Sequence, residues 1–300
     1  MISRSVIIAV VVLAVAASSF GQPGSAGLSF LKLGVGGRSI AMGEASAANV
    51  NDVSAMHYNP SALRTVRNPQ ILLMHKEWLQ KTQTEYIAAA FPLGSFSVGA
   101  SLNTTSIPEI EIRTVPGPPQ GTFSAQNVSI GITGAYEIDT TISVGITSKY
   151  LYEKILVDEA GGLGFDLGAL YYTPWDFKVG LSVANLGSME DLRNESTKLP
   201  TTLRFGAAWS RPFEEINGIL TVAGDVVSVT PEKQSHIHLG FEFAYKQLFA
   251  VRSGYMSGYD SKSVSLGAGI HYGMFTVDYG FVPFKLDLGT THTFSLAIEL

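Results

Sequence analysis

Apolar and small polar residues alternate with a period of two from about residue 70 to the end of this chain. One run reads VSIGIT at 128–133, and another reads ISVGIT at 142–147. The same alternation returns in later runs at 179–183, 203–209, 237–243, 264–270, 275–281 and 294–300. Successive side chains of a strand point to opposite faces, so each run predicts a β-strand with one apolar face.

The second face of these predicted strands argues against an ordinary soluble sandwich, whose outer face would carry many Lys and Glu residues. Here that face is mostly Gly, Ser, Thr and Ala, and charged residues make up only 15% of the chain. An average soluble domain has about 25%. A face of small polar residues suits the lumen of a transmembrane barrel, while the aliphatic and aromatic face suits lipid. The pattern therefore predicts strands that cross a membrane.

The number of strands follows from counting the alternating runs. We expect about fourteen, centred near residues 74, 87, 98, 130, 146, 168, 181, 205, 222, 240, 252, 268, 278 and 295. An even number is typical of bacterial single-chain barrels. The predicted fold is all-β, an antiparallel transmembrane β-barrel over residues 69–300. Short turns are expected on one rim at 91–94, 136–140, 172–176 and 272–274, and long loops on the other at 106–122, 153–162 and 187–200.

The N-terminus is typical of an export signal. Arg4 supplies the positive charge, residues 6–17 are apolar, and small residues follow. The apolar run is too short for a spanning helix, which needs about 20 residues. Residues 1–21 are therefore interpreted as a cleaved signal peptide, with an uncleaved anchor as the alternative. Together with the barrel, this signal predicts the outer membrane of a Gram-negative bacterium, with its lipid as a partner.

Residues 22–68 do not alternate, and we expect them to form a small helical plug inside the barrel. The Ala-rich pieces 39–48 and 53–57 suit short helices, and the Asn59–Pro60 pair suits a break between helices. Arg38 lies among Gly and apolar residues, where an unpaired charge would be costly. We therefore expect Arg38 to attach the plug to lumen carboxylates such as Asp166 or Asp278.

Two motifs in this segment carry a resemblance to a known family. The first runs from Leu33 to Ala45, and the second from Asn59 to Leu63. Their matching residues, which are the predicted plug-motif residues, are Gly34, Gly36, Arg38, Met42, Gly43, Asn59, Pro60 and Leu63. Together they resemble the N-terminal signature of the PorV/PorQ family of outer-membrane proteins, relatives of the FadL-type barrels.

The resemblance implies a fourteen-stranded outer-membrane barrel with an N-terminal plug. Members resembling PorV bind cargo of the type IX secretion system and pass it to an attachment complex. The function expected first is therefore a non-enzymatic component of type IX secretion that binds cargo proteins or attachment-complex subunits. The alternative is a FadL-like channel for uptake of hydrophobic small molecules, because FadL-type relatives pass such molecules inward through a lateral opening.

Several other chemistries find little support in the sequence. Cys is absent, which excludes disulfides, thiol nucleophiles and Cys-ligated metals, and the net charge of −5 gives no basic footprint for nucleic acid. No G-x-S-x-G elbow is present. His236, His238 and Glu242 share a strand face as metal-ligand candidates, and Glu109 and Glu111 as an acid–base pair. We interpret all five as scattered lumen or loop residues, so no catalytic, cofactor or metal site is predicted.

Overall fold

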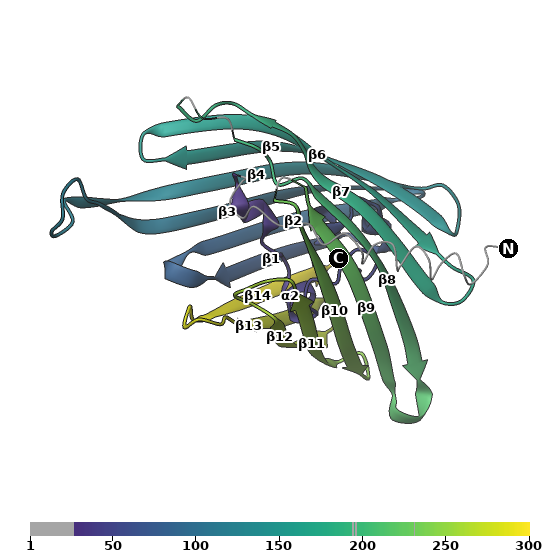
Figure 1. Ribbon diagram of the computed structural model, residues 1–300. Coiled ribbons are helices and arrows are strands. Elements are labelled where there is room, and N and C mark those ends of the chain that lie inside the picture. The colour runs from purple at the N-terminus through teal and green to yellow at the C-terminus, as the bar shows by residue number, and fades with distance from the viewer. Residues whose placement is uncertain (1–26, 194, 196, 231) are drawn as a thin grey trace.

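The computed structural model describes residues 27–193, 195, 197–230 and 232–300. The predicted signal peptide, 1–21, and the first residues of the predicted plug segment, 22–26, lie outside this part of the chain. Within the described residues, fourteen strands form a closed antiparallel barrel in which each strand pairs with its sequence neighbours and β14 pairs with β1 (Figure 1). The predicted fold class is confirmed, and each strand contains its predicted centre.

The wall of the barrel has an uneven height. The strands are β1 Gln70–Glu77, β2 Gln83–Leu93, β3 Phe96–Ile112, β4 Gly121–Glu137, β5 Ile142–Ile155, β6 Asp158–Tyr172, β7 Phe177–Met189, β8 Thr202–Phe213, β9 Gly218–Val229, β10 Gln234–Tyr245, β11 Phe249–Ser257, β12 Val264–Tyr272, β13 Phe275–Pro283 and β14 Thr290–Glu299. Strands β3 and β4 have 17 residues each, whereas β11, β12 and β13 have 9. The β3–β4 hairpin consequently projects beyond its neighbours in Figure 1.

Two of the predicted long loops are shorter than expected. The connection expected over 106–122 is only 113–120, because the ladder between β3 and β4 shifts register between Ile107 and Ile110 and then continues. This shift accommodates Pro108, which cannot donate to the ladder. The connection expected over 153–162 is a two-residue turn at 156–157, since β5 and β6 pair up to Ile155 and Asp158. On the opposite rim the four predicted short turns are confirmed.

The alternation of the sequence becomes the two faces of the wall. Ile132 and Ile146 point outward and are 69% and 51% exposed, and other large apolar side chains share that outer surface. Thr133 and Thr147 point into the lumen, are buried, and form a hydrogen bond of 2.7 Å to each other. An apolar outer surface with small polar residues inside is the arrangement of a barrel that faces lipid.

Residues 27–66 pack against the lumen face of the barrel wall, and we refer to this segment as the plug. Its helices are η1 Ser29–Lys32, α2 Gly37–Ala41, α3 Ala55–Tyr58 and η2 Pro60–Thr65, with η3 Leu79–Lys81 and η4 Glu214–Ile216 at the rims. Met56, Tyr58 and Leu63 of the plug are buried in one cluster with Leu72 and Leu170 of the wall. The helix expected over 39–48 ends at residue 41, because Gly43 takes a φ of +64° and turns the chain. No helix among the described residues is long and apolar enough to cross a membrane.

Glycines on the lumen face let the plug approach the backbone of the wall. A Cβ added at Gly145 would lie 2.5 Å from the carbonyl carbon of Pro60, and one at Gly180 would lie 2.0 Å from the carbonyl oxygen of Ala47. Real Cβ atoms do not approach other atoms so closely. The small residues of the lumen face therefore form the surface on which the plug packs, here called its seat.

Candidate functional site

Arg38 of α2 attaches the plug to the barrel wall. It is buried, and its Nε and Nη2 atoms each donate to the carboxylate of Glu242 at 2.9 Å. Its Nη1 atom donates to the backbone oxygen of Asn49 at 2.9 Å. Burial opposes the charged form, but the carboxylate of Glu242 outweighs burial and raises the pKa of Arg38. The fork geometry makes this contact bidentate and directional.

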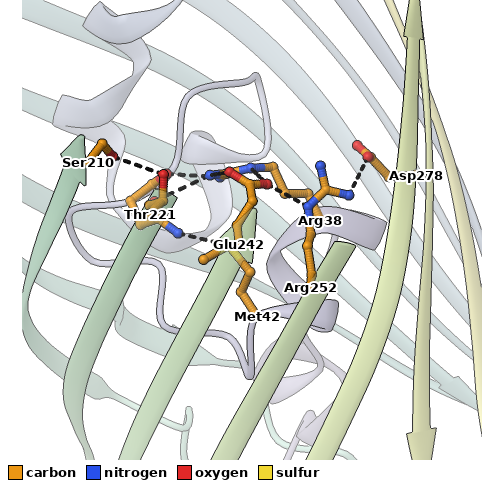
Figure 2. Close-up of polar contacts among 8 residues, drawn as sticks. Arg38, Met42, Ser210, Thr221, Glu242, Arg252 and Asp278 are labelled. Carbon is orange, nitrogen blue, oxygen red and sulfur yellow. Dashed lines mark hydrogen bonds and ion pairs between the residues drawn. The ribbon is translucent and has the colours of Figure 1, made fainter. Parts of the chain in front are cut away.

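Glu242 belongs to a chain of alternating charges that crosses three strands. Its second partner is Arg252, which lies opposite it in the register of β10 and β11 and donates from Nε at 2.5 Å. Arg252 also donates from Nη1 to Asp278 of β13 at 2.6 Å. Figure 2 shows Glu242 between the two arginines, with Asp278 beyond Arg252.

The predicted partners of Arg38 are therefore corrected. Arg38 does pair with a lumen carboxylate, but that carboxylate is Glu242. Asp278 joins the network only through Arg252, and Asp166 pairs with Lys149 at 2.5 Å. The sequence shows that a buried arginine needs an acid, but the register of strands around the barrel decides which acid it meets.

A second attachment holds the turn that follows α2, and sequence reasoning missed it. The carboxylate of Asp225 in β9 accepts hydrogen bonds from the backbone nitrogens of Ser46 and Ala47 at 2.7 and 2.8 Å. Arg204 of β8 pairs with Asp225 at 3.1 Å and donates to the backbone oxygen of Glu44 at 2.7 Å. Plug and wall are thus joined by charge-assisted hydrogen bonds at both of these places, and Arg64 of η2 adds a further ion pair with Glu137 of β4 at 2.7 Å.

The glycines of the first motif allow close approaches. Gly36 has a φ of +79° and donates from its backbone nitrogen to the sulfur of Met74 at 3.1 Å. Gly43 donates to the hydroxyl of Ser265 at 3.0 Å, and a Cβ at Gly43 would lie 2.8 Å from the backbone oxygen of Leu239. Larger residues would therefore be strained at both positions.

Gly34 and Met42 of the same motif are closely packed. A Cβ at Gly34 would lie 2.8 Å from both the Glu44 carboxylate carbon and the Tyr58 hydroxyl. Met42 is fully buried, and its sulfur accepts a hydrogen bond from Nδ2 of Asn49 at 3.2 Å. Asn49 therefore links Met42 to Arg38, whose guanidinium it also contacts.

The Asn59–Pro60 pair lies at the centre of the plug. Asn59 is fully buried and donates from Nδ2 to the backbone oxygens of Ala47 at 2.7 Å and Ala169 at 3.2 Å, so it joins two plug segments to β6. Its Oδ1 atom accepts from the Ser61 hydroxyl at 2.7 Å. Pro60 begins η2, and Leu63 of the same helix is fully buried in the core.

Asn59→Ala is expected to loosen the plug. The change leaves the buried backbone oxygen of Ala47 without this donor and removes a second, partly buried bond to Ala169, and a buried acceptor that loses its donor costs about 1–3 kcal/mol. We expect proteolysis within residues 27–66 to accelerate by about tenfold or more, measured on the purified protein in detergent. Asn68→Ala is the control, because Asn68 bonds only to the exposed Glu299 side chain. Equal proteolysis of the two variants would show that Asn59 does not hold the plug.

Two cavities flank the plug. One cavity, here called the inner cavity, lies toward the rim of short turns. It has a volume of about 440 Å³ and is bordered by Arg38, Glu242 and Leu248. The other, here called the outer cavity, lies toward the opposite rim. It has a volume of about 420 Å³ and is bordered by Ile40 and Glu44 together with residues of that rim. The plug thus lies between two spaces that open toward opposite ends of the barrel.

The outer cavity contains titratable groups of the plug. Burial opposes ionisation of Glu44, yet Lys262 at 3.1 Å and other nearby cations lower the pKa of Glu44 far below its usual range. Burial and the charge of Lys149 lower the pKa of His57 to about 3, so the His57 ring is neutral near pH 7. The carboxylate and the imidazole are therefore held in fixed charge states.

The residues weighed as metal ligands or acid–base groups are engaged in other contacts. His238 bonds to the Tyr259 hydroxyl at 2.9 Å, His236 stacks on the Tyr259 ring at 3.7 Å, and Glu242 is occupied by two arginines. No group of three or more His, Cys, Asp or Glu residues suited to a metal ion occurs in the described part of the chain. Glu109 and Glu111 pair with Lys81 and Arg113 on exposed surface.

Comparison with known proteins assigns the family. Residues 5–164 match the model of the uncharacterised protein family UPF0164. The chain belongs to this family. No curated protein matches the sequence of this UPF0164 member. Its resemblance to the PorV/PorQ family in particular stays a prediction.

Solved structures with the same fold include proteins described as a channel and a transporter. The UPF0164 chain is similar to the monoaromatic hydrocarbon channel CymD, with 12% identity over 89% of this chain and 98% of that chain, and a TM-score of 0.64. It is similar to the toluene transporter TodX of Pseudomonas putida, with 11% identity, 88% and 96% coverage, and a TM-score of 0.63. It is also similar to a FadL homologue of Pseudomonas aeruginosa, with 12% identity over 88% of this chain and 97% of that chain, and a TM-score of 0.53. At these identities the likeness is one of fold.

Proposed function

We propose that this protein is a plugged channel of the outer membrane that passes hydrophobic small molecules into a Gram-negative cell. The observation that carries the proposal is the pair of cavities on opposite sides of a plug, inside a closed barrel. A permeant would enter the outer cavity, and movement of the plug would connect that cavity to the inner one. The reaction is transport, with no bond made or broken.

The outer surface supports a place in the lipid bilayer. Side chains such as Ile132, Ile270 and Phe294 are 69%, 53% and 52% exposed. In water so many exposed apolar side chains would be a liability, whereas in lipid they are matched. The export signal expected over residues 1–21 agrees with this location. The channel function of CymD and TodX is a property of those proteins and serves here as support by analogy of fold.

A component of type IX secretion is the second candidate, and we rank it below the channel. Cargo or partner subunits would bind long loops on the outer rim. One of the loops expected there, 153–162, is a two-residue turn, which leaves less surface for a folded partner. The loops at 113–120 and 190–201 would have to provide the binding.

A deletion strain separates the two candidates. We expect slower uptake of toluene and of other hydrophobic compounds at low external concentration, with an unchanged surface proteome, and recovery of uptake on complementation. The measurement is accumulation of labelled compound beside quantitative proteomics of the cell surface and periplasm. Normal uptake with surface proteins retained in the periplasm would instead establish the secretion role.

A further inference from the structure

Lys76 of β1 is a buried cation that borders the outer cavity. It is 5% exposed, and its Nζ atom donates to the backbone oxygen of Gly34 at 3.3 Å. Within the described residues, no carboxylate approaches it within the 4.0 Å of an ion pair. A buried ammonium without a counter-ion is costly, so this position favours a bound anion.

The other cations that border the cavity have acidic partners. The pairs are Lys32–Glu232 at 2.5 Å, Lys149–Asp166 at 2.5 Å, Arg204–Asp225 at 3.1 Å and Lys262–Glu44 at 3.1 Å. Their charges are balanced in place. Of the five cations that border the cavity, Lys76 alone has no ion pair within the described residues, because the nearby Glu44 carboxylate is paired with Lys262. Five positive and four negative charges leave room for one negative charge on a ligand.

Two buried hydroxyl groups on β14, the strand that pairs with β1, have no hydrogen-bond partner among the described residues. Thr293 of β14 lies directly opposite Lys76 in the register, and Thr291 lies two residues away on the same lumen face. Both are buried, and the Oγ1 atom of each has no hydrogen-bond partner among the described residues. A hydroxyl donates readily to an anionic oxygen. Thr291 borders the cavity, so the Lys76 ammonium and the Thr291 hydroxyl together are suited to a carboxylate.

Aromatic and aliphatic side chains border the cavity beside this polar group. Trp78 follows Lys76 by two residues, and its ring lies 6.4 Å from that of Phe284, measured between centroids. Val282 and Ile40 extend the apolar wall. Flat rings prefer to pack on other rings in offset or edge-to-face arrangements. The cavity of about 420 Å³ ends at the plug, which suits a compact body better than an extended chain.

We propose that the outer cavity binds compact aromatic monocarboxylates, with the carboxylate at Lys76 and Thr291 and the ring against Trp78 and Phe284. This inference rests on the proposed channel function and names its substrate class. A neutral hydrocarbon would leave the Lys76 ammonium and the Thr291 hydroxyl unpaired, which makes it the poorer ligand.

The test is ligand binding to the full chain in detergent, observed through Trp78. Trp175→Phe and Trp209→Phe leave Trp78 as the only tryptophan, because the chain contains three. The probes are benzoate, its neutral analogue benzyl alcohol, and octanoate. We expect benzoate to bind at least tenfold more tightly than benzyl alcohol and more tightly than octanoate. Lys76→Met should weaken benzoate binding by about tenfold or more, since a hydrogen bond to a charged group is lost.

The matched control is Lys178→Met, which removes a partly buried cation that borders the inner cavity. It should leave benzoate binding unchanged, and Lys76→Met should leave benzyl alcohol binding unchanged. Benzoate binding that is insensitive to Lys76→Met, or no tighter than that of benzyl alcohol, would overturn the anionic class. Octanoate binding as tight as benzoate would overturn the aromatic class.

Permeation into liposomes distinguishes this failure from failure of the channel itself. If toluene permeates faster than into liposomes without the protein, while benzoate neither binds nor permeates faster, the substrate class is wrong and the channel stands. If benzoate binds in a Lys76-dependent way but neither compound permeates, the binding site stands and the transport function is wrong.

Discussion

Glu242→Gln is expected to release the plug from the wall and to make the barrel leaky. The change leaves the guanidiniums of Arg38 and Arg252 next to each other without the carboxylate that both contact. Removal of one partner from a buried ionic network costs about 3–5 kcal/mol. Asp278 still pairs with Arg252, so the loss falls mainly on Arg38 and the plug. We expect faster swelling of liposomes in a small sugar, together with rapid proteolysis of residues 27–66.

Glu299→Gln serves as the control for this change. Glu299 also borders the inner cavity, but its carboxylate contacts the exposed Asn68 rather than the plug. Its swelling rate and proteolysis should match those of the wild type. If Glu242→Gln leaves both measurements unchanged, the other contacts of the plug, those of Asp225 with the turn at 46–47 and of Arg64 with Glu137, hold it without help from Arg38.

The strands were predictable because the alternation of apolar and small polar residues within each strand indicates which face meets lipid. The runs at 128–133 and 142–147 each indicate a strand and its apolar face without knowledge of the pairing partner. They lie in β4 and β5, which pair with each other. The start of the first strand, β1 at Gln70, also followed from a local signal, the loss of alternation before residue 69. Such features depend on neighbouring residues in the sequence, so the sequence alone contains them.

The polar contacts were not predictable in the same way. Arg38 and Glu242 are 204 residues apart, and they meet because the barrel closes with a particular register. Lys76 and Thr293 meet across the seam where β1 joins β14, which no local pattern reports. The acid expected for Arg38 was therefore the right residue type at the wrong position.

Composition indicated a polar lumen but not its role in packing. Gly168 and Gly180 were part of a small-residue face whose glycines suggested a confined interior. In the structure, a Cβ at Gly168 would lie 2.1 Å from Oδ1 of Asn59, so the glycine is required by the plug and not by the strand. Whether a strand glycine is needed depends on what packs over it, and that contact exists only after the plug has docked.

Gly180→Val is accordingly expected to displace the plug while the barrel still closes. A Cβ at Gly180 would lie 2.0 Å from the backbone oxygen of Ala47 and 2.9 Å from the nitrogen of Ala48, and backbone atoms cannot rotate away as a side chain can. Overpacking of this kind costs about 1–3 kcal/mol and sometimes more. We expect rapid proteolysis of residues 27–66 and faster liposome swelling, with the heat-dependent gel mobility of a folded barrel retained.

Gly134→Val is the matched control, because Gly134 is also a strand glycine and has nothing within 4 Å of its added Cβ. It should behave as the wild type in all three measurements. Gly180→Ala adds a single carbon and should give an intermediate effect, since the contact with Ala47 begins at the Cβ atom. If Gly180→Val and Gly134→Val are proteolysed at the same rate, the plug can shift by the missing distance without leaving its seat. The lumen glycines would then be spacers rather than the surface that holds the plug in place.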